Sequence, residues 1–115
     1  MDRKTVTIFR ALSHPSRLRI VKMLEERELC VCEVRAILGL STSTVSKHLT
    51  ILCDAGLITD SRDGKWVNYK LNSTTRDTLI RPLLSALKTG LETELQIKAD
   101  RDRARTVDRN RLCSL

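Results

Sequence analysis

The sequence predicts a mainly α-helical domain that carries one small β-hairpin. Three observations support this fold class. Apolar residues recur at helical spacing along most of the chain, as on the buried faces of amphipathic helices. A short helix, a turn at Gly39 and a second helix with a hydroxyl cap follow one another, which is the pattern of a helix–turn–helix. Asp63-Gly64 then separates two alternating runs, as in a hairpin, so we expect a winged helix-turn-helix.

Size and composition limit the classes of protein that fit. A chain of 115 residues is enough for one domain with a modest core. A net charge of +7 and a pI near 9.7 favour an anionic partner, first nucleic acid and second a membrane surface. Because no long apolar run or signal-peptide core is present, we expect no membrane partner and a cytoplasmic location. Thiols stay reduced there, so the four cysteines are expected as ligands, reactive thiols or core residues.

The first two helices are expected over residues 5–12 and 15–27. Proline at residue 15 suits the first turn of a helix, after a hydroxyl cap at Ser13. The buried face of the first helix should contain Val6, Phe9 and Leu12, and that of the second Leu18, Ile20, Val21 and Leu24. The other positions of the second helix are expected to form a solvated charged face of Arg17, Arg19, Lys22, Glu25 and Glu26.

The helix–turn–helix occupies residues 32–55. A bridge-like strand at residues 28–31 leads into a helix that Gly39 ends as a left-handed cap. Ser41 or Thr42 caps the second helix. Spacing of i, i+4 and i+7 turns its apolar residues Val45, Leu49 and Leu52 toward the core.

The second helix is the expected DNA-reading helix. A recognition helix enters the major groove with its N-terminal residues at the bases, and hydroxyl and lysine side chains hydrogen-bond to bases and phosphates. His48 either donates to a phosphate or lies half-buried. A hydroxyl-rich surface helix without a partner is the alternative. The expected contacts are Thr42, Ser43, Thr44, Ser46, Lys47 and His48, with Arg62 and Lys65 from the hairpin tip.

The C-terminal third is expected to contain one long helix over residues 76–99. Pro82 either begins or kinks it. Its leucine stripe exceeds what a small domain needs, which favours a homodimer over packing within one chain. Residues 1–99 would then form the DNA-binding and dimerisation domain, and residues 100–115 a basic tail, either frayed helix or disordered.

Cys30 and Cys32 form a C-x-C pair at the expected strand-to-helix junction. Thiols two residues apart on an ideal helix point to nearly opposite sides, but they converge if the first turn is distorted. An ion held by both would therefore strain the helix that packs on the recognition helix. Both cysteines can equally be small core residues.

Three segments carry a family resemblance. ELCVCE (28–33), STSTVSKHLTIL with AGLI (41–58) and DGKWVNYKL (63–71) resemble the ArsR/SmtB family of winged-helix metalloregulatory repressors. The similarity covers about residues 8–72. It implies that Cys30 and Cys32 bind As(III) or Sb(III) as inducer, or alternatively Cd(II) or Pb(II). It also implies a homodimer on a palindromic double-stranded operator, with the first and last helices at the interface, and release of the DNA on ligand binding.

The chain departs from the family pattern at several points. Arg35 stands where arsenic-sensing members usually have a third cysteine. A third thiolate must therefore come from Cys53, Cys113 or a small-molecule thiol, or is absent. Cys113 is favoured, because Cys53 should point away from the pair. Residues 1–29 lack the cysteines of the cadmium and lead branch, which favours arsenic. The last helix lacks the family's His/Asp zinc site.

Three other functions compete with this reading. A redox- or persulfide-responsive repressor would close a Cys30–Cys32 bridge, which is strained. A constitutive winged-helix protein would have passive cysteines. A thiol enzyme such as an arsenate reductase needs an anion loop beside a nucleophilic cysteine, or a C-x-x-C motif. The sequence has neither, so we expect that the protein is not an enzyme.

Overall fold

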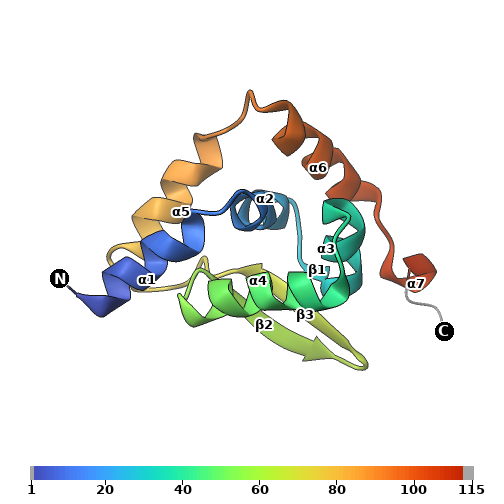
Figure 1. The fold of residues 1–115 in the computed structure, drawn as a ribbon, viewed down its shortest axis with the longest axis horizontal. Coiled ribbons are helices and arrows are strands. Elements are labelled where there is room, and N and C mark those ends of the chain that lie inside the picture. Colours follow the sequence, from blue (N-terminus) through green and yellow to red (C-terminus); the bar gives the residue numbers. More distant parts are fainter. Residues whose placement is uncertain (1, 113–115) are drawn as a thin grey trace.

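The computed structural model describes residues 2–112 and has the winged helix-turn-helix fold (Figure 1). A three-stranded antiparallel sheet in the order β1-β3-β2 lies beside the helices. In chain order the elements are α1 (Arg3–Leu12), α2 (Pro15–Leu24), β1 (Leu29–Cys30), α3 (Val31–Leu38), α4 (Thr42–Asp54), β2 (Ile58–Asp63), β3 (Trp66–Leu71), α5 (Ile80–Thr89), α6 (Leu95–Thr106) and α7 (Arg109–Leu112).

The local signals around α3 and α4 are confirmed. Gly39 ends α3 in the left-handed conformation at φ 71°, which a side chain would strain. Ser41 caps α4 by accepting the N–H of Thr44 at 3.3 Å. The core that these two helices share is aliphatic, and the predicted inward residues of α4 are all buried: Val45, Leu49 and Leu52.

The predicted face of α1 is wrong by about one position. Ile8 and Ala11 are buried, at 1% and 0% exposure, whereas Phe9 is 50% exposed. The helix begins two residues earlier than expected, at the cap made by Asp2. Ser13 donates back to the Phe9 carbonyl at 2.7 Å, and His14 rather than Ser13 caps α2. Phe9 is therefore a large apolar side chain on the surface.

Lys22 on α2 does not belong to a solvated face. Its side chain is 1% exposed, and its Nζ lies 2.8 Å from Glu25 and 3.1 Å from Glu92. Nζ also donates to the Leu87 carbonyl. A buried ammonium is tolerated only with such partners, and those from the C-terminal third are distant in sequence.

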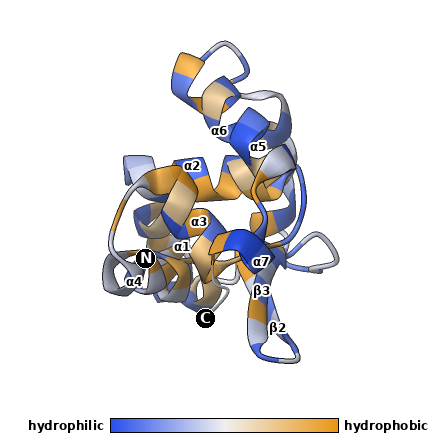
Figure 2. Ribbon diagram, turned by 90° about the vertical axis from the view of Figure 1, so that its right-hand side faces the viewer, coloured by the Kyte–Doolittle hydropathy of each residue, from blue (hydrophilic) through white to orange (hydrophobic). Residues whose placement is uncertain are grey.

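The hairpin is confirmed with a turn one residue later than predicted. Asp63 pairs with Trp66, so the loop is Gly64-Lys65 and not Asp63-Gly64. Gly64 has φ 62°, the positive value that a tight hairpin loop requires. Lys65 therefore lies in the turn itself. Figure 2 shows the hairpin projecting from the body of the domain.

The single long helix predicted over residues 76–99 is wrong. The chain forms α5 and α6, separated at Gly90–Glu94, where Leu91 adopts φ 64°. Pro82 lies in the first turn of α5, as one of the two alternatives expected. A Cβ at Gly90 would lie 3.3 Å from the Ala86 carbonyl oxygen, so this glycine suits the tight end of α5.

Helix α6 turns back over α2 and α3 (Figure 1). Residue 100, the expected start of the tail, lies within this helix. Asp100 is 2% exposed and accepts hydrogen bonds from Arg19 at 2.7 and 3.0 Å. The expected tail is thus helical as far as Thr106 and packs on the domain through ion pairs. Cys113, the favoured third ligand, lies outside the described residues.

Candidate nucleic-acid interface and thiol site

The N-terminal half of α4 presents a polar surface. Thr42, Ser43, Thr44 and Lys47 are exposed, while Ser46 and His48 are half-buried. Ser41 caps the N-terminus of α4, and a helix N-terminus attracts anions. Helix α4 and the hairpin lie on the same side of the molecule (Figure 1), and Arg62 and Lys65 are exposed on the hairpin.

Arg17 contacts the half-buried His48. The sequence pattern did not predict this contact. The Arg17 Nη1 lies 3.2 Å from His48 Nδ1, and its Nε donates to the Ala11 carbonyl at 2.7 Å. Because a guanidinium only donates, Nδ1 is the acceptor and His48 carries its proton on Nε2. Burial lowers the pKa of His48, and the neighbouring His14 and Arg17 lower it further. The ring is therefore neutral at pH 7 and retains one N–H donor.

The hairpin formed by β2 and β3, called the wing below, carries both positive and negative side chains. Arg109 on the C-terminal helix α7 contacts it. Arg109 donates to Asp63 and to Asn68, each at 2.9 Å. Its guanidinium carbon lies 5.0 Å from the centre of the Trp66 ring, and the Lys65 ammonium lies 4.9 Å from the same centre. Both distances are within the range of cation–π contacts. No sequence motif marked α7 as a partner of the wing.

The thiol of Cys30 lies at the predicted strand-to-helix junction. Cys30 is the N-cap of α3 and is 2% exposed. It forms a capping box with Glu33, whose carboxylate accepts the Cys30 N–H at 2.9 Å. Burial raises the pKa of the Cys30 thiol; the Glu33 N–H opposes this and the Glu33 carboxylate adds to it. The free thiol is therefore mostly protonated at pH 7.

Cys32 and Cys53 occupy different environments. Cys32 is the second residue of α3 and is half-buried. Cys53 lies on α4 against the core, and burial raises the pKa of its thiol to about 11, with help from Asp60 and Asp54. Cys113 is outside the described residues. Within residues 2–112, no three His, Cys, Asp or Glu side chains are arranged to hold a metal ion.

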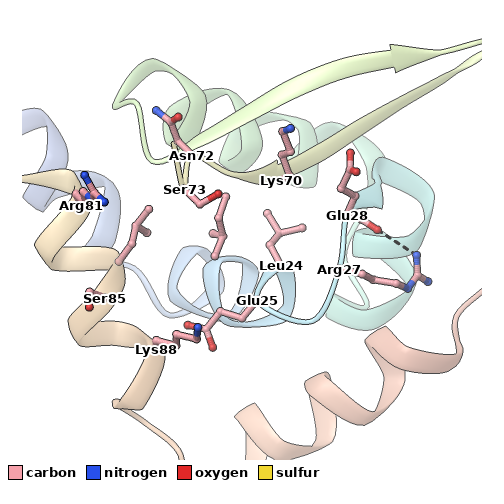
Figure 3. Close-up of a pocket in the computed structure, with 12 residues that line it drawn as sticks. Leu24, Glu25, Arg27, Glu28, Lys70, Asn72, Ser73, Arg81, Ser85 and Lys88 are labelled. Carbon is pink, nitrogen blue, oxygen red and sulfur yellow. Dashed lines mark hydrogen bonds between the residues drawn. The ribbon is translucent and has the colours of Figure 1, made fainter. Parts of the chain in front are cut away.

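A cavity of about 460 Å³ lies between α2, β3 and α5 (Figure 3). Leu24, Leu71 and Leu84 contribute apolar surface to it, and Arg81 and Lys88 contribute charge from α5. None of the predicted DNA contacts or cysteines lines it. The cavity therefore lies beside α5 and is separate from the predicted DNA-binding surface and from the thiol site.

A short helix, a glycine turn, a second helix with a polar N-terminal half and a β-hairpin define the winged helix-turn-helix class of regulators. The family model described as bacterial regulatory protein, arsR family, matches residues 14–60. The arsenical resistance operon repressor of Staphylococcus aureus is 38% identical over 77 residues, which are 67% of this chain and 74% of that protein. The chain belongs to the arsR family of bacterial regulatory proteins.

Two further comparisons agree with this assignment. The arsenical resistance operon repressor of Escherichia coli K12 is 41% identical over 68 residues, 58% of each protein, so the chain spans little more than half of that relative. HlyU from Vibrio cholerae has the same fold, with a TM-score of 0.63 and 31% identity over 76% of this chain and 94% of that one. The family consists of bacterial regulatory proteins. No helix within residues 2–112 is long and apolar enough to cross a membrane.

Proposed function

We propose that this protein is a metalloid-responsive transcriptional repressor. It binds a palindromic double-stranded operator as a homodimer and is released when As(III) or Sb(III) binds the thiolates of Cys30 and Cys32. The observation that carries the proposal is the position of Cys30. This cysteine caps the helix that packs directly against the predicted DNA-reading helix.

The DNA contacts are assigned to α4 and the wing. The exposed hydroxyls and Lys47 at the N-terminal half of α4 suit base edges and phosphates. The Nε2–H of His48 suits a phosphate oxygen, since Arg17 occupies the other ring nitrogen. Arg62 and Lys65 would contact the backbone from the wing. The overall charge of +7 supports the same partner.

The link between ligand and DNA is the first turn of α3. A soft ion prefers thiolate ligands, and holding both Cys30 and Cys32 requires this turn to move. Movement at Cys30 breaks its hydrogen bond to Glu33 and shifts α3 against α4. Couplings of this kind amount to about 1–3 kcal/mol and are reciprocal, so the operator must weaken metalloid binding by the same factor.

The third ligand is assigned to Cys113, with a small-molecule thiol as the other source. The thiol of Cys53 lies against the core beside Asp60 and Tyr69, where burial keeps it protonated. A repressor of the same fold that responds to Cd(II), Pb(II) or thiol oxidation is the second candidate. The same cysteine pair supports it, because soft divalent ions also prefer thiolates.

The decisive experiment measures operator binding by fluorescence anisotropy with reduced protein and parallel titrations of arsenite, antimonite and cadmium. The wild type should release the operator at low arsenite and antimonite. Cys30→Ser should bind DNA normally and resist release, while the control Cys53→Ser should behave as wild type. Normal release in Cys30→Ser would refute the thiol site. Release by cadmium alone would select the second candidate.

A further inference from the structure

The C-terminal segment 96–112, called the strap below, lies across α2 and α3 and reaches the wing. Its helical part is fixed by ion pairs and hydrogen bonds to distant residues. Arg19 makes two hydrogen bonds to Asp100, and Arg103 donates to the Ala36 carbonyl at the C-terminal half of α3 at 3.0 Å. The strap is thus attached to the helix that carries the thiol pair.

One guanidinium joins the strap to the cap of the thiol helix. The Nε of Arg27 donates to the Ala104 carbonyl at 2.8 Å, and its Nη2 donates to the Val107 carbonyl at 2.6 Å. The same Nη2 lies 3.0 Å from Glu33, whose other oxygen accepts the Cys30 N–H. The side chain of Glu33 is 4% exposed and that of Arg27 is 37% exposed, so the carboxylate is buried and depends on Arg27 as its charged partner.

The far end of the strap holds the wing through Arg109. This side chain bonds Asp63 and Asn68 on the two strands of the hairpin and covers the Trp66 ring. Arg109 itself is half-buried, whereas the Asp63 side chain is 64% exposed. The contacts therefore run without interruption from Cys30 through Glu33, Arg27 and Val107 to the wing.

We propose that Arg109 is a positioning residue for DNA binding and that the strap transmits ligand binding at Cys30 to the wing. The proposal rests on the proposed function. In the free protein Arg109 fixes the hairpin and neutralises Asp63, whose carboxylate would otherwise face the phosphates. Ligand binding breaks the Cys30–Glu33 cap, frees Arg27 from the strap and releases Arg109. A mobile wing with an unpaired carboxylate binds DNA less well.

Trp66 is the only tryptophan of the chain, so its fluorescence reports on the strap without a label. Arg109→Gln should make Trp66 more accessible to acrylamide and weaken operator binding roughly two- to fivefold, the range of exposed ion pairs. The matched control is Arg111→Gln, because Arg111 lies on α7, is exposed and makes no side-chain hydrogen bond or ion pair within residues 2–112. Arg109→Lys should restore part of the affinity. Equal quenching in Arg109→Gln, the control and the wild type would overturn the proposal.

A second measurement tests the transmission and needs no DNA. Arsenite binding is followed calorimetrically in parallel with Trp66 quenching in reduced protein. In the wild type, arsenite should raise the accessibility of Trp66, and in Arg109→Gln it should add little. Arsenite binding that leaves Trp66 unchanged in the wild type would refute the strap and leave the proposed function standing. Absence of arsenite binding would refute the proposed function, and the Arg109→Gln comparison would still decide whether the strap holds the wing.

Discussion

Burial has different consequences for the thiols of Cys30, which is buried, and Cys53, which is half-buried. Cys30 is buried at a helix cap, where its backbone N–H and its sulfur both face Glu33. Cys53 lies in the last turn of α4 with its side chain against the core, and burial raises the pKa of its thiol to about 11. Only at Cys30 does a change at the thiol also change a hydrogen bond that shapes a helix. Position, and not the thiol pKa, therefore distinguishes the candidate sensor from the core residue.

Lys47 offers a test of the DNA-reading surface at the scale of one residue. It is exposed within the first two turns of α4, beside the hydroxyl side chains. Lys47→Ala should weaken operator binding, and if Lys47 contacts a phosphate the slope of log affinity against log salt should fall by roughly one. The affinity of the free dimer for arsenite should stay the same. The control is Lys98→Ala, an exposed lysine on α6; equal losses in both variants would indicate a nonspecific effect of charge.

At the scale of elements, local sequence signals were sufficient to predict the winged helix-turn-helix. The arrangement of the C-terminal helices depends on pairs of residues that are distant in the sequence. Gly39, Ser41 and the Asp-Gly pair act on their own neighbours, so the sequence predicts α3, α4 and the hairpin. The return of α6 depends on pairs such as Arg19 with Asp100, 81 residues apart. No periodicity encodes such a pair. Gly90 was the one local sign that the C-terminal helix ends early.

The same reasoning explains the errors at Phe9 and Lys22. Which face of α1 is buried depends on how α1 packs on the rest of the domain, and not on its own apolar spacing. Lys22 is buried because Glu92 and the Leu87 carbonyl approach it from the C-terminal third. For the sites, the thiol junction and the polar half of α4 could be predicted. Arg17, Arg27 and Arg109 could not, since an arginine in a charged helix looks the same whether it is solvated or paired.

Asp77, in the segment before α5, connects α1 to the start of α5 through interactions that depend on its ionised carboxylate. Asp77 accepts the N–H groups of Leu79 and Ile80 at 2.8 and 3.0 Å, and its other oxygen lies 2.6 Å from the Lys4 ammonium on α1. The hydrogen bond from Lys4, together with those N–H groups, lowers the pKa of Asp77 to about 2. Arg101 and Lys22 lower the pKa of Glu92 to about 2 as well.

Both carboxylates should therefore contribute to acid unfolding. A pKa that is lower in the folded state stabilises the fold fully above the unfolded value, about 4, and the contribution is lost as the pH falls toward 2. In Asp77→Asn, the melting temperature should be lower at pH 6 and should fall less steeply between pH 4 and pH 2 than in the wild type. Thermal unfolding followed by circular dichroism measures this. The control is Asp102→Asn, at an exposed carboxylate. If the melting temperature of Asp77→Asn depended on pH as that of the wild type does, Asp77 would not contribute to acid unfolding.

At the scale of the whole molecule, the apolar surface left by one chain indicates where a second copy packs. Phe9 on α1 is 50% exposed, and Leu83, Leu84 and Leu87 on α5 are only partly buried. The Lys4–Asp77 ion pair ties α1 to the start of α5. The interface expected at the first and last helices is thus proposed for α1 and α5, because α6 is occupied by its ion pairs with α2.

Phe9→Asp should weaken the homodimer, because it places a charge where the proposed interface buries an aromatic ring. Large apolar anchors of this kind are worth about 2 kcal/mol or more, so the dimer dissociation constant should rise by at least about thirtyfold. Sedimentation velocity over a range of concentrations measures the change, and Phe9→Leu is the control that keeps apolar area. Operator affinity should fall in parallel, since a monomer contacts one half-site and loses the second recognition helix. A Phe9→Asp protein that sediments as the wild-type dimer would place the interface elsewhere. Operator affinity that survives dissociation would instead show that one winged helix suffices.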